Sequence, residues 1–376
     1  MVHDALTFLG LALVTVVLFG VTLLLFRSFA AHRDELARRW AGRGQAALTA
    51  GKPGEAIVAL RTALSYAPDR REYELLLAQA LGDAGHTEES YNYFMGLWET
   101  RPGDGFINLR LARLAAAKGD ARDAEKFYRA SMYGTWEGDA TERRRDVRLE
   151  LARYLLGRHD NNGARTELMI AGGNTPGDPA LALRLAPMLE EAGAPADALA
   201  YYQRVLAAEP RNEKALEAAG RLEFSLGDFE EAHRLLERAI RLHNTAGAGV
   251  SAVDAGLLEK SERILELMPS SKLPSRVRVA RIVAARTLAK KRFDACSAEV
   301  TAMGESSSAL QGLSSAWADK NLGAGADALR TNEDVQDATV KLIFDTEIQT
   351  SEVCGAPSGD DALLLLMARS PSALDR

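Results

Sequence analysis

Few residues of this chain combine the types and spacing that catalysis requires. The six histidines form neither an HxH nor an HExxH arrangement, which a zinc site on a helix would need. The adjacent acids Asp360 and Asp361 could act as a carboxylate pair, but capping and the helix dipole explain acids that open a helix. Neither a GxSxG elbow nor a phosphate loop of the GxxxxGKS or GxxxxGKT type occurs. We therefore expect a protein that is not an enzyme, with no metal and no cofactor.

The two cysteines could do redox chemistry or form a crosslink. Cys296 and Cys354 are 58 residues apart and belong to no CxxC pair. We expect two reduced thiols in an apolar core. The alternative is a disulfide, if this part of the chain lies outside the cytoplasm, where oxidising conditions preserve such bonds.

Arginines at regular spacing are the remaining candidates for a functional site. Composition limits what they could bind. A chain of 376 residues with 47% hydrophobic residues can build a substantial core. Its formal net charge of −6 argues against general nucleic-acid binding, and no basic patch interleaved with aromatic residues appears.

A period of 34 residues runs through the middle of the chain. Residues expected in turns between helices recur at steps of 34, 34, 40, 34 and 34, at Gly51, Gly85, Gly119, His159, Gly193 and Gly227. Prolines keep the same register at Pro68, Pro102, Pro176 and Pro210. Glycine favours the left-handed turn that ends a helix, and proline cannot continue the helical hydrogen-bond ladder. A fixed period of this length indicates a solenoid of stacked helix pairs.

Counted from Ala37, the period divides the chain into six repeats, with six inserted residues at 139–144. The repeats are 37–70, 71–104, 105–138, 145–178, 179–212 and 213–246. The eighth position is always Gly or Ala, at Gly44, Ala78, Ala112, Ala152, Ala186 and Gly220. The twenty-fourth is always bulky, at Leu60, Phe94, Tyr128, Leu168, Tyr202 and Leu236. A small residue lets the paired helix approach closely, and a large one fills the space beside it.

This pattern resembles the tetratricopeptide repeat (TPR) family, in which each repeat forms two helices. Trp40 matches the family's tryptophan at the fourth position of a repeat. The resemblance implies an all-α solenoid over residues 37–246. Trp136 and Asn244 replace the proline found in the other four repeats, so the ends of the third and sixth repeats depart from the pattern. We expect a local kink at Trp136.

The resemblance also implies a concave groove lined by the first helix of each repeat, where partners bind. Its fifth and ninth positions supply our candidate groove residues: Gln79, Leu109, Arg113, Leu149, Arg153 and Arg221. The arginines could hold a carboxylate or an acidic peptide through charge-assisted hydrogen bonds. Alternatively, Arg113 and Arg153 pair with acids of neighbouring repeats. The clamp of lysines and asparagines used by chaperone-binding members of the family is not reproduced.

The amino-terminal segment has no charged residue from Ala5 to Phe26. As a helix, these residues would be about 33 Å long, which is enough to cross the hydrocarbon core of a membrane. A cleaved signal peptide is the alternative, but it would need a basic region before the apolar run, and Met1–Asp4 contains no Lys or Arg. We therefore expect a transmembrane helix at residues 5–26.

Arginines follow this span and none precedes it, at Arg27, Arg33, Arg38, Arg39 and Arg43. Basic residues beside a span favour the cytoplasmic side, so we expect a cytoplasmic TPR region. The same arginines could contact anionic lipid headgroups. They would also form the solvated face of the first helix in either orientation, which leaves a periplasmic TPR region as the alternative.

Residues 247–376 are less regular. After a linker, residues 257–268 are expected to form a short amphipathic helix that ends before Pro269. Residues 277–310 resemble a degenerate seventh repeat, with Lys291 in place of the turn glycine.

Three further helices are expected beyond this repeat. Residues 309–322 and 331–351 have helical apolar spacing, and Asn332 is a suitable N-cap for the second. Residues 362–368 are expected to form a small helix that caps the solenoid, because a terminal repeat otherwise exposes an apolar face. The alternative is a separate interaction domain.

These features together predict a bacterial adaptor, a single-pass inner-membrane TPR protein that holds partner proteins. The architecture is similar to the lipopolysaccharide assembly protein B family, but the paired CxxC motifs of that family's metal domain are absent. The expected partners are peptides or helices of other proteins, integral membrane subunits, and lipid around residues 5–26, with no nucleic acid. Two alternatives are an accessory subunit of a large membrane complex and a periplasm-facing TPR protein of envelope assembly.

Overall fold

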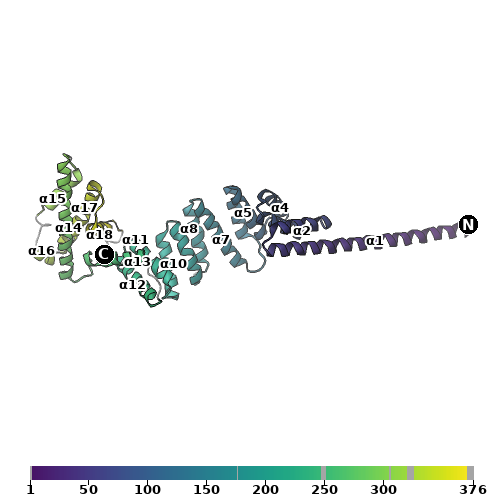
Figure 1. Ribbon diagram of the computed structural model, residues 1–376, viewed down its shortest axis with the longest axis horizontal. Helices are drawn as coiled ribbons and strands as arrows, with labels where there is room; N and C mark the ends of the chain where they lie inside the picture. The colour runs from purple at the N-terminus through teal and green to yellow at the C-terminus, as the bar shows by residue number, and fades with distance from the viewer. Residues whose placement is uncertain (1, 176, 247–250, 305, 320–325, 371–376) are drawn as a thin grey trace. The chain divides into compact units, whose positions relative to one another are not determined.

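The computed structural model describes all residues except 1, 176, 247–250, 305, 320–325 and 371–376. The described residues form eighteen helices, α1 to α18 (Figure 1). The expected all-α class is therefore confirmed. The chain divides into two compact units, an amino-terminal unit of Met1–Ala171 and a carboxyl-terminal unit of Gly172–Arg376.

The amino-terminal unit is a series of helices that pack in sequence order. Its helices are α1 (Val2–Thr49), α2 (Pro53–Tyr66), α3 (Arg71–Asp83), α4 (Thr87–Thr100), α5 (Gly105–Lys118), α6 (Ala121–Tyr133), α7 (Ala140–Gly157) and most of α8 (Asn161–Gly173). The end of α1 and α2 form the first helix pair, α3 and α4 the second, and α5 and α6 the third.

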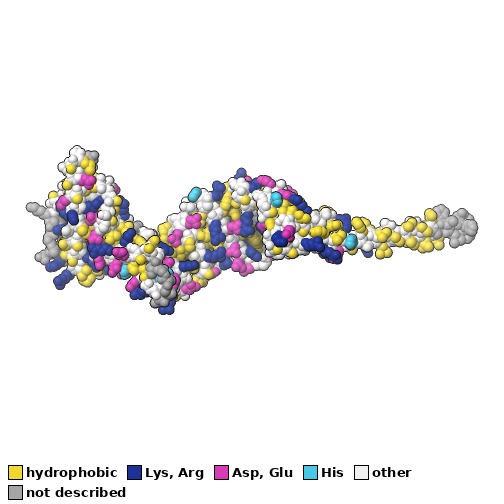
Figure 2. Space-filling view, viewed as in Figure 1, with side chains coloured by type: hydrophobic (Ala, Val, Ile, Leu, Met, Phe, Trp, Pro, Cys, Tyr) yellow, Lys and Arg dark blue, Asp and Glu magenta, His cyan; other side chains and the backbone are white. Residues whose placement is uncertain are grey.

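Helix α1 joins the apolar amino-terminal segment to the first repeat without a break. Where side chains of this segment are described they are solvent-exposed, for example Leu24 and Phe26 at 71% and 72%. Figure 2 shows these hydrophobic side chains along the part of α1 that extends from the other helices of its unit. Among the described residues, α1 alone is long and apolar enough to cross a membrane, which fits an anchor or a signal sequence.

Close approach of the paired helices depends on the small residues of the eighth position. A Cβ atom on Gly44 would lie 2.5 Å from Cγ of Leu60, and one on Gly220 would lie 2.8 Å from Cγ of Leu236. The alanines at this position in the other four repeats are fully buried, at Ala78, Ala112, Ala152 and Ala186. The predicted pairing of a small residue with a bulky one is therefore confirmed.

The turns inside the repeats use the left-handed backbone that the glycines predicted. Gly51, Gly85 and Gly119 have φ angles of 68°, 82° and 78°. His159 occupies the equivalent turn of the fourth repeat with φ 62°, and it is the one non-glycine residue with positive φ among those described. An L-residue with a Cβ atom is strained in this conformation, whereas glycine is not.

The six inserted residues lengthen a helix instead of forming a loop. Helix α7 has 18 residues, against 14 in α5, and Asp139 caps it by accepting hydrogen bonds from the backbone N–H groups of Thr141 and Glu142. Before this cap, the backbone around Thr135 pairs with that of Gly103 and Gly105 in an isolated bridge with N···O distances of 2.8 Å. The repeat pattern is thus broken at Trp136 because the backbone just before it forms a short bridge between the connections that precede α5 and α7.

The carboxyl-terminal unit continues with helix pairs and ends in a bundle. Its helices after α8 are α9 (Pro179–Glu191), α10 (Pro195–Ala208), α11 (Glu213–Leu226), α12 (Phe229–Ala246), α13 (Ala252–Leu267), α14 (Ser275–Ala302), α15 (Ser308–Trp317), α16 (Ala326–Thr331), α17 (Glu333–Cys354) and α18 (Gly359–Arg369). Helix α12 continues past Asn244, since no proline stops it there. Helix α13 accounts for the amphipathic helix expected at 257–268.

The prediction of a seventh repeat at residues 277–310 is wrong. Helix α14 runs for 28 residues without a turn and passes straight through Lys291. Lysine and arginine are good helix formers, and this stretch offers neither glycine nor proline to stop the helix. Beyond α14, the N-cap is confirmed, because the Asn332 side chain accepts hydrogen bonds from the N–H groups of Asp334 and Val335. The helix expected at 309–322 is α15, and residues 320–322 lie outside the described residues.

Helices α14 and α17 lie parallel in a constant register. Arg278 bonds to Gln336, Arg292 bonds to Thr350, and Cys296 is joined to Cys354 by a disulfide, each pair 58 residues apart. The register brings the Cα atoms of the cysteines to 5.8 Å, within the range that a disulfide requires. The expectation of two reduced thiols is therefore wrong, because two distant segments meet side by side.

Helix α18 closes the apolar core of this bundle. Its Leu364 and Met367 are fully buried in a cluster that includes Ile282 of α14 and Phe344 of α17. Phe229 of α12, the last repeat helix, belongs to the same cluster. The small helix expected at residues 362–368 therefore covers a core that the final repeat shares with the carboxyl-terminal helices.

Candidate partner-binding groove

The amino-terminal unit contains a hollow of about 870 Å³ between its second and fourth repeats. We call this hollow the groove. It is lined by Leu75, Arg101, Gly103, Asp104, Phe106, Leu109, Arg113, Thr135, Trp136, Glu137, Arg143, Asp146, Val147 and Glu150. Its volume falls in the range of sites that hold a small molecule or a few side chains of a peptide.

An ion pair across two repeats fixes part of the groove wall. Arg113 of α5 donates from Nε and Nη2 to the two carboxylate oxygens of Glu150 on α7, at 2.6 and 2.7 Å. Tyr128 of α6 donates its hydroxyl to the same carboxylate at 3.0 Å. A bidentate arginine–carboxylate pair holds both side chains in one orientation. The alternative in which Arg113 pairs with an acid of a neighbouring repeat is thus confirmed.

This pair also shifts the ionisation of its members. Burial raises the pKa of Glu150, but the hydrogen bond and the charge of Arg113 outweigh burial and lower it below its usual range. Burial and then the nearby Glu150 carboxylate raise the pKa of the Tyr128 hydroxyl. The carboxylate therefore stays ionised and the phenol stays protonated at neutral pH, so the charge of Arg113 is already neutralised.

Trp136 forms a fixed aromatic part of the wall. Its indole Nε1 donates to the carbonyl of Ser131 at 3.0 Å. The ring lies against the backbone of Gly105, where a Cβ atom would come within 2.3 Å of Nε1. Thr135, the neighbouring residue, is held by the two backbone hydrogen bonds of the bridge. The tryptophan is thus positioned before any partner arrives.

Two other arginines of the groove lack an ion-pair partner in the part of the chain that the structure describes. The exposed guanidinium groups of Arg101 and Arg143 form no hydrogen bond or ion pair with any residue that the structure describes. Glu137 is likewise exposed and unpaired within the described residues. Asp104, by contrast, caps α5 by accepting hydrogen bonds from the N–H groups of Phe106 and Ile107.

Of the candidate groove residues in this unit, two line the groove and three do not. Leu109 and Arg113 line the groove. Leu149 is 1% exposed and packs inside the repeats, Gln79 is half-buried on α3, and Arg153 is exposed on α7 away from the groove lining.

Arg221 lies in the carboxyl-terminal unit and has an acidic partner there. Its Nη1 donates to both carboxylate oxygens of Asp254 on α13, at 3.0 and 3.2 Å. Asp254 is 2% exposed, so this charge is compensated inside the fold. The arrangement is comparable to that of Arg113 and Glu150, because a repeat helix again pairs with the helix that follows the repeat.

A second hollow, of about 470 Å³, lies in the carboxyl-terminal unit among α12, α17, α18 and residues 268–271. Both of its basic residues already have partners. Arg278 pairs with Asp337 at 2.7 Å, and Lys341 pairs with Asp345 at 2.5 Å. It therefore offers no unpaired cation to a partner, unlike the groove.

Sequence reasoning missed Trp136, Arg101 and Arg143 as groove residues. It followed the first helix of each repeat, whereas Arg101 and Trp136 lie in the connections between repeats and Arg143 lies in the insertion. The signal was present, since the insertion and the tryptophan in place of proline were the two irregularities of this stretch. Within the described residues, no group of three His, Cys, Asp or Glu side chains could hold a metal ion.

The repeats of this chain are similar to those of known proteins. Two family models, both described as tetratricopeptide repeat, match the chain, one over residues 42–93 and 149–213 and the other over 189–252. No curated protein matches the chain.

Solved structures of repeat proteins are also similar. They include PilF of Pseudomonas aeruginosa, with 16% identity, coverage of 61% of this chain and 98% of that chain, and a TM-score of 0.40. The C-terminal part of a TPR protein from Cytophaga hutchinsonii has 14% identity, coverage of 64% and 93%, and a TM-score of 0.45. YrrB, described as a TPR protein with an unusual peptide-binding site, has 16% identity, coverage of 55% and 98%, and a TM-score of 0.39. At these identities the likeness concerns the fold alone. The family matches and the helix pairs show that the chain contains tetratricopeptide repeats.

Proposed function

We propose that this protein is a membrane-anchored adaptor that binds a segment of another protein in the groove of its amino-terminal unit. The observation that carries the proposal is the groove itself, a hollow of about 870 Å³ with apolar side chains, a fixed tryptophan and unpaired charges. Such a combination of apolar surface with a few polar groups suits the recognition of a polypeptide. The adaptor performs no chemistry of its own.

The apolar part of α1 supports the anchoring. Its described side chains are exposed to the surroundings instead of being packed in a core, and a long exposed apolar helix is stable in a lipid environment. Helix α1 then continues directly into the first repeat. The repeats would therefore be held next to an inner membrane, where the adaptor gathers its partners.

The disulfide favours the periplasmic side of that membrane. Disulfides persist in oxidising compartments and are rare in the cytosol, so the bond between Cys296 and Cys354 opposes the cytoplasmic placement expected from the arginines after the span. These arginines also have structural roles. Arg33 donates to the carbonyl of Tyr66 at 2.6 Å, and Arg39 pairs with Glu35 at 2.9 Å. We therefore infer that the TPR region faces the periplasm.

Labelling of one introduced cysteine tests the orientation. Met303 is 61% exposed, and Met303→Cys in a chain lacking the two native cysteines provides a single reactive thiol. We expect an impermeant maleimide to label it in intact spheroplasts. Labelling only after the membrane is permeabilised would place the region in the cytoplasm and overturn the inferred orientation.

Site-specific photo-crosslinking in cells tests the groove. A photoreactive residue at Glu137, which lines the groove, is expected to form a discrete adduct with a partner protein. The matched control is the same residue at Arg153, which is exposed on α7 outside the groove lining. Equal adducts at both positions, or none at Glu137, would contradict the proposed binding site.

A further inference from the structure

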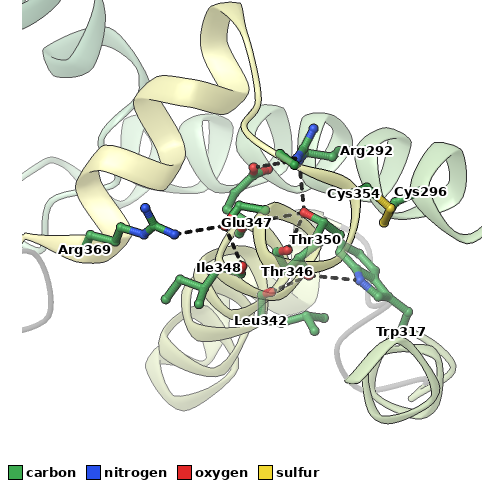
Figure 3. A network of polar contacts seen from close by, with 12 residues as sticks. Arg292, Cys296, Trp317, Leu342, Thr346, Glu347, Ile348, Thr350, Cys354 and Arg369 are labelled. Carbon is green, nitrogen blue, oxygen red and sulfur yellow. Dashed lines mark hydrogen bonds and ion pairs between the residues drawn. A yellow bond between two sulfur atoms is a disulfide. The ribbon is translucent and has the colours of Figure 1, made fainter. Parts of the chain in front are cut away.

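Glu347 is a buried carboxyl group at the place where α14, α17 and α18 meet (Figure 3). Its side chain is fully buried, and neither of its oxygens has a hydrogen-bond partner among the described residues. An ionised carboxylate needs either water or hydrogen-bond donors, and this site supplies neither. The surroundings of Glu347 therefore favour its protonated, uncharged form.

Arg292 of α14 lies beside Glu347 but directs its hydrogen bonds elsewhere. Its Nε is 3.5 Å from a carboxylate oxygen of Glu347. The same Nε donates to the Thr350 hydroxyl at 3.0 Å, and Nη2 donates to the Gly355 carbonyl at 2.7 Å. The guanidinium therefore binds neutral acceptors, and it attracts Glu347 through its charge without a hydrogen bond.

A second carboxyl group, that of Asp361 in the first turn of α18, shares this cation. Its Oδ1 is buried and also lacks a hydrogen-bond partner among the described residues. Burial, and then the charge of Asp361, raise the pKa of Glu347, while Arg292 opposes this shift. Burial raises the pKa of Asp361 too, with Arg292 and Lys291 lowering it and Asp360 raising it. Ionisation of both acids would thus place two negative charges beside one buried guanidinium.

The disulfide between Cys296 and Cys354 determines which helix can move. It joins α14 to α17 about one helical turn beyond Arg292 and Thr350, so these two helices stay together when the bundle opens locally. Helix α18 has no covalent link of this kind, because the chain has no other cysteine. Helix α18 is therefore the element whose movement would admit water to Glu347.

Noncovalent contacts hold α18 on the bundle. Leu364 and Met367 are fully buried in the apolar core. At the first turn of α18, Asp360 accepts hydrogen bonds from Nε and Nη2 of Arg263 on α13, at 3.0 and 2.7 Å. A helix of 11 residues held in this way can open as a unit while the rest of the bundle stays folded.

We propose that α18 is a proton-coupled latch: docking of α18 on α17 keeps one proton on the carboxyl pair of Glu347 and Asp361, and release of α18 gives that proton to water. In the released state Glu347 is hydrated and separated from Asp361, so it ionises as an ordinary glutamate does. The latch operates within the carboxyl-terminal unit and depends neither on the groove nor on the side of the membrane that this unit faces.

The direction of the pH dependence follows from this proton. The pKa of Glu347 is about 8 with α18 docked and returns toward the ordinary value of 4.5 with α18 released. Between these two values release is accompanied by loss of the proton, so its equilibrium constant rises by up to about tenfold per pH unit. The latch is consequently firmest below about pH 4.5, and its release no longer depends on pH above about 8.

Hydrogen exchange of the purified full chain in detergent tests the latch. Exchange of the backbone amides of Gly359–Arg369 is followed by mass spectrometry between about pH 5.5 and 7.5 and corrected for the intrinsic pH dependence of exchange. We expect the protection of α18 to fall by about ten- to a hundredfold over this range. We also expect α18 to be less protected than α14 at each pH, because it opens locally. Protection of α18 that does not change with pH, or that equals the protection of α14 throughout, would overturn the latch.

Substitutions identify the group that holds the proton. Glu347→Gln keeps the shape of the side chain but does not titrate, so its α18 should show no fall in protection over the same range. Glu352→Gln, at an exposed position on the same helix, is the matched control and should retain the native fall. Asp360→Asn loses the ion pair with Arg263, so it should weaken protection at every pH and keep the fall. A fall that survives Glu347→Gln would overturn the proposal, and the pH series on the native chain tests the latch independently of these variants.

Discussion

Trp136 lies against the backbone of Gly105 so closely that a Cβ atom on Gly105 would come within 2.3 Å of the indole Nε1. The contact joins the irregular connection after α6 to the start of α5, and it holds the aromatic wall of the groove. Gly105 is the first residue of the regular helix α5, so its backbone conformation does not demand glycine. Glycine is required here because a side chain would collide with the Trp136 ring.

Gly105→Ala should therefore displace Trp136. The new methyl group forces the ring or the backbone to move, and overpacking of this kind typically costs about 1–3 kcal/mol. We expect a lower melting temperature, a shift of tryptophan fluorescence and weaker binding in the groove. Gly103→Ala is the matched control, since no atom lies within 4 Å of its added Cβ. Equal effects of the two substitutions would contradict the close contact.

Glu347 is a buried carboxyl group in the carboxyl-terminal bundle (Figure 3). Neither of its oxygens has a hydrogen-bond partner among the described residues, and Nε of Arg292 on α14 is 3.5 Å away. Arg292 already donates to the Thr350 hydroxyl and the Gly355 carbonyl. Burial, and then the negative charge of Asp361 on α18, raise the pKa of Glu347 to about 8.

The stability of this bundle should consequently fall as the pH rises. The pKa of Glu347 is higher in the folded state than in the unfolded state, so its contribution is fully present below about pH 4.5 and is lost as the pH rises through about 8. Glu347→Gln removes this dependence. We expect its melting temperature to exceed that of the native chain by more at pH 8 than at pH 5. Glu352→Gln, at an exposed position on the same helix, should show no such difference.

The disulfide between Cys296 and Cys354 should contribute strongly to the same bundle. It closes a loop over a sequence separation of 58 residues, for which the chain-entropy model gives about 4 kcal/mol. We expect Cys296→Ser with Cys354→Ser to lower the urea midpoint for the carboxyl-terminal unit. Adding a reductant to the native chain should have the same effect, and the double variant should not respond to reductant. An unchanged urea midpoint of the native chain after reduction would contradict a stabilising role of the disulfide.

His159 is expected to strain the turn of the fourth repeat. With φ 62° it occupies the left-handed region in which the other turns have glycine. His159→Gly should remove strain of about 1–2 kcal/mol, partly offset by the greater freedom of glycine in the unfolded chain. We expect a small rise in the melting temperature. The reverse change, Gly193→Ala at φ 69°, should lower it, and the same sign for both changes would contradict the argument.

The repeat architecture could be predicted from the sequence because its determinants are local. A small residue such as Gly44 and a bulky one such as Leu60 recur within one repeat, and turn glycines recur every 34 residues. Each repeat contacts mainly its neighbours, so a periodic pattern specifies the stacking directly. The apolar length of α1 and the N-cap at Asn332 are local signals of the same kind.

Features that depend on distant segments could not be predicted from the sequence. Cys296 and Cys354 meet because α14 and α17 lie parallel in register, which no pattern in either helix specifies. The same limit applies to the groove, where Arg113 pairs with Glu150 while Arg101 and Arg143 have no ion-pair partner among the described residues. Sequence spacing determines which residues share a helix face, but neutralisation of a charge depends on which acid lies within hydrogen-bond distance after the helices pack.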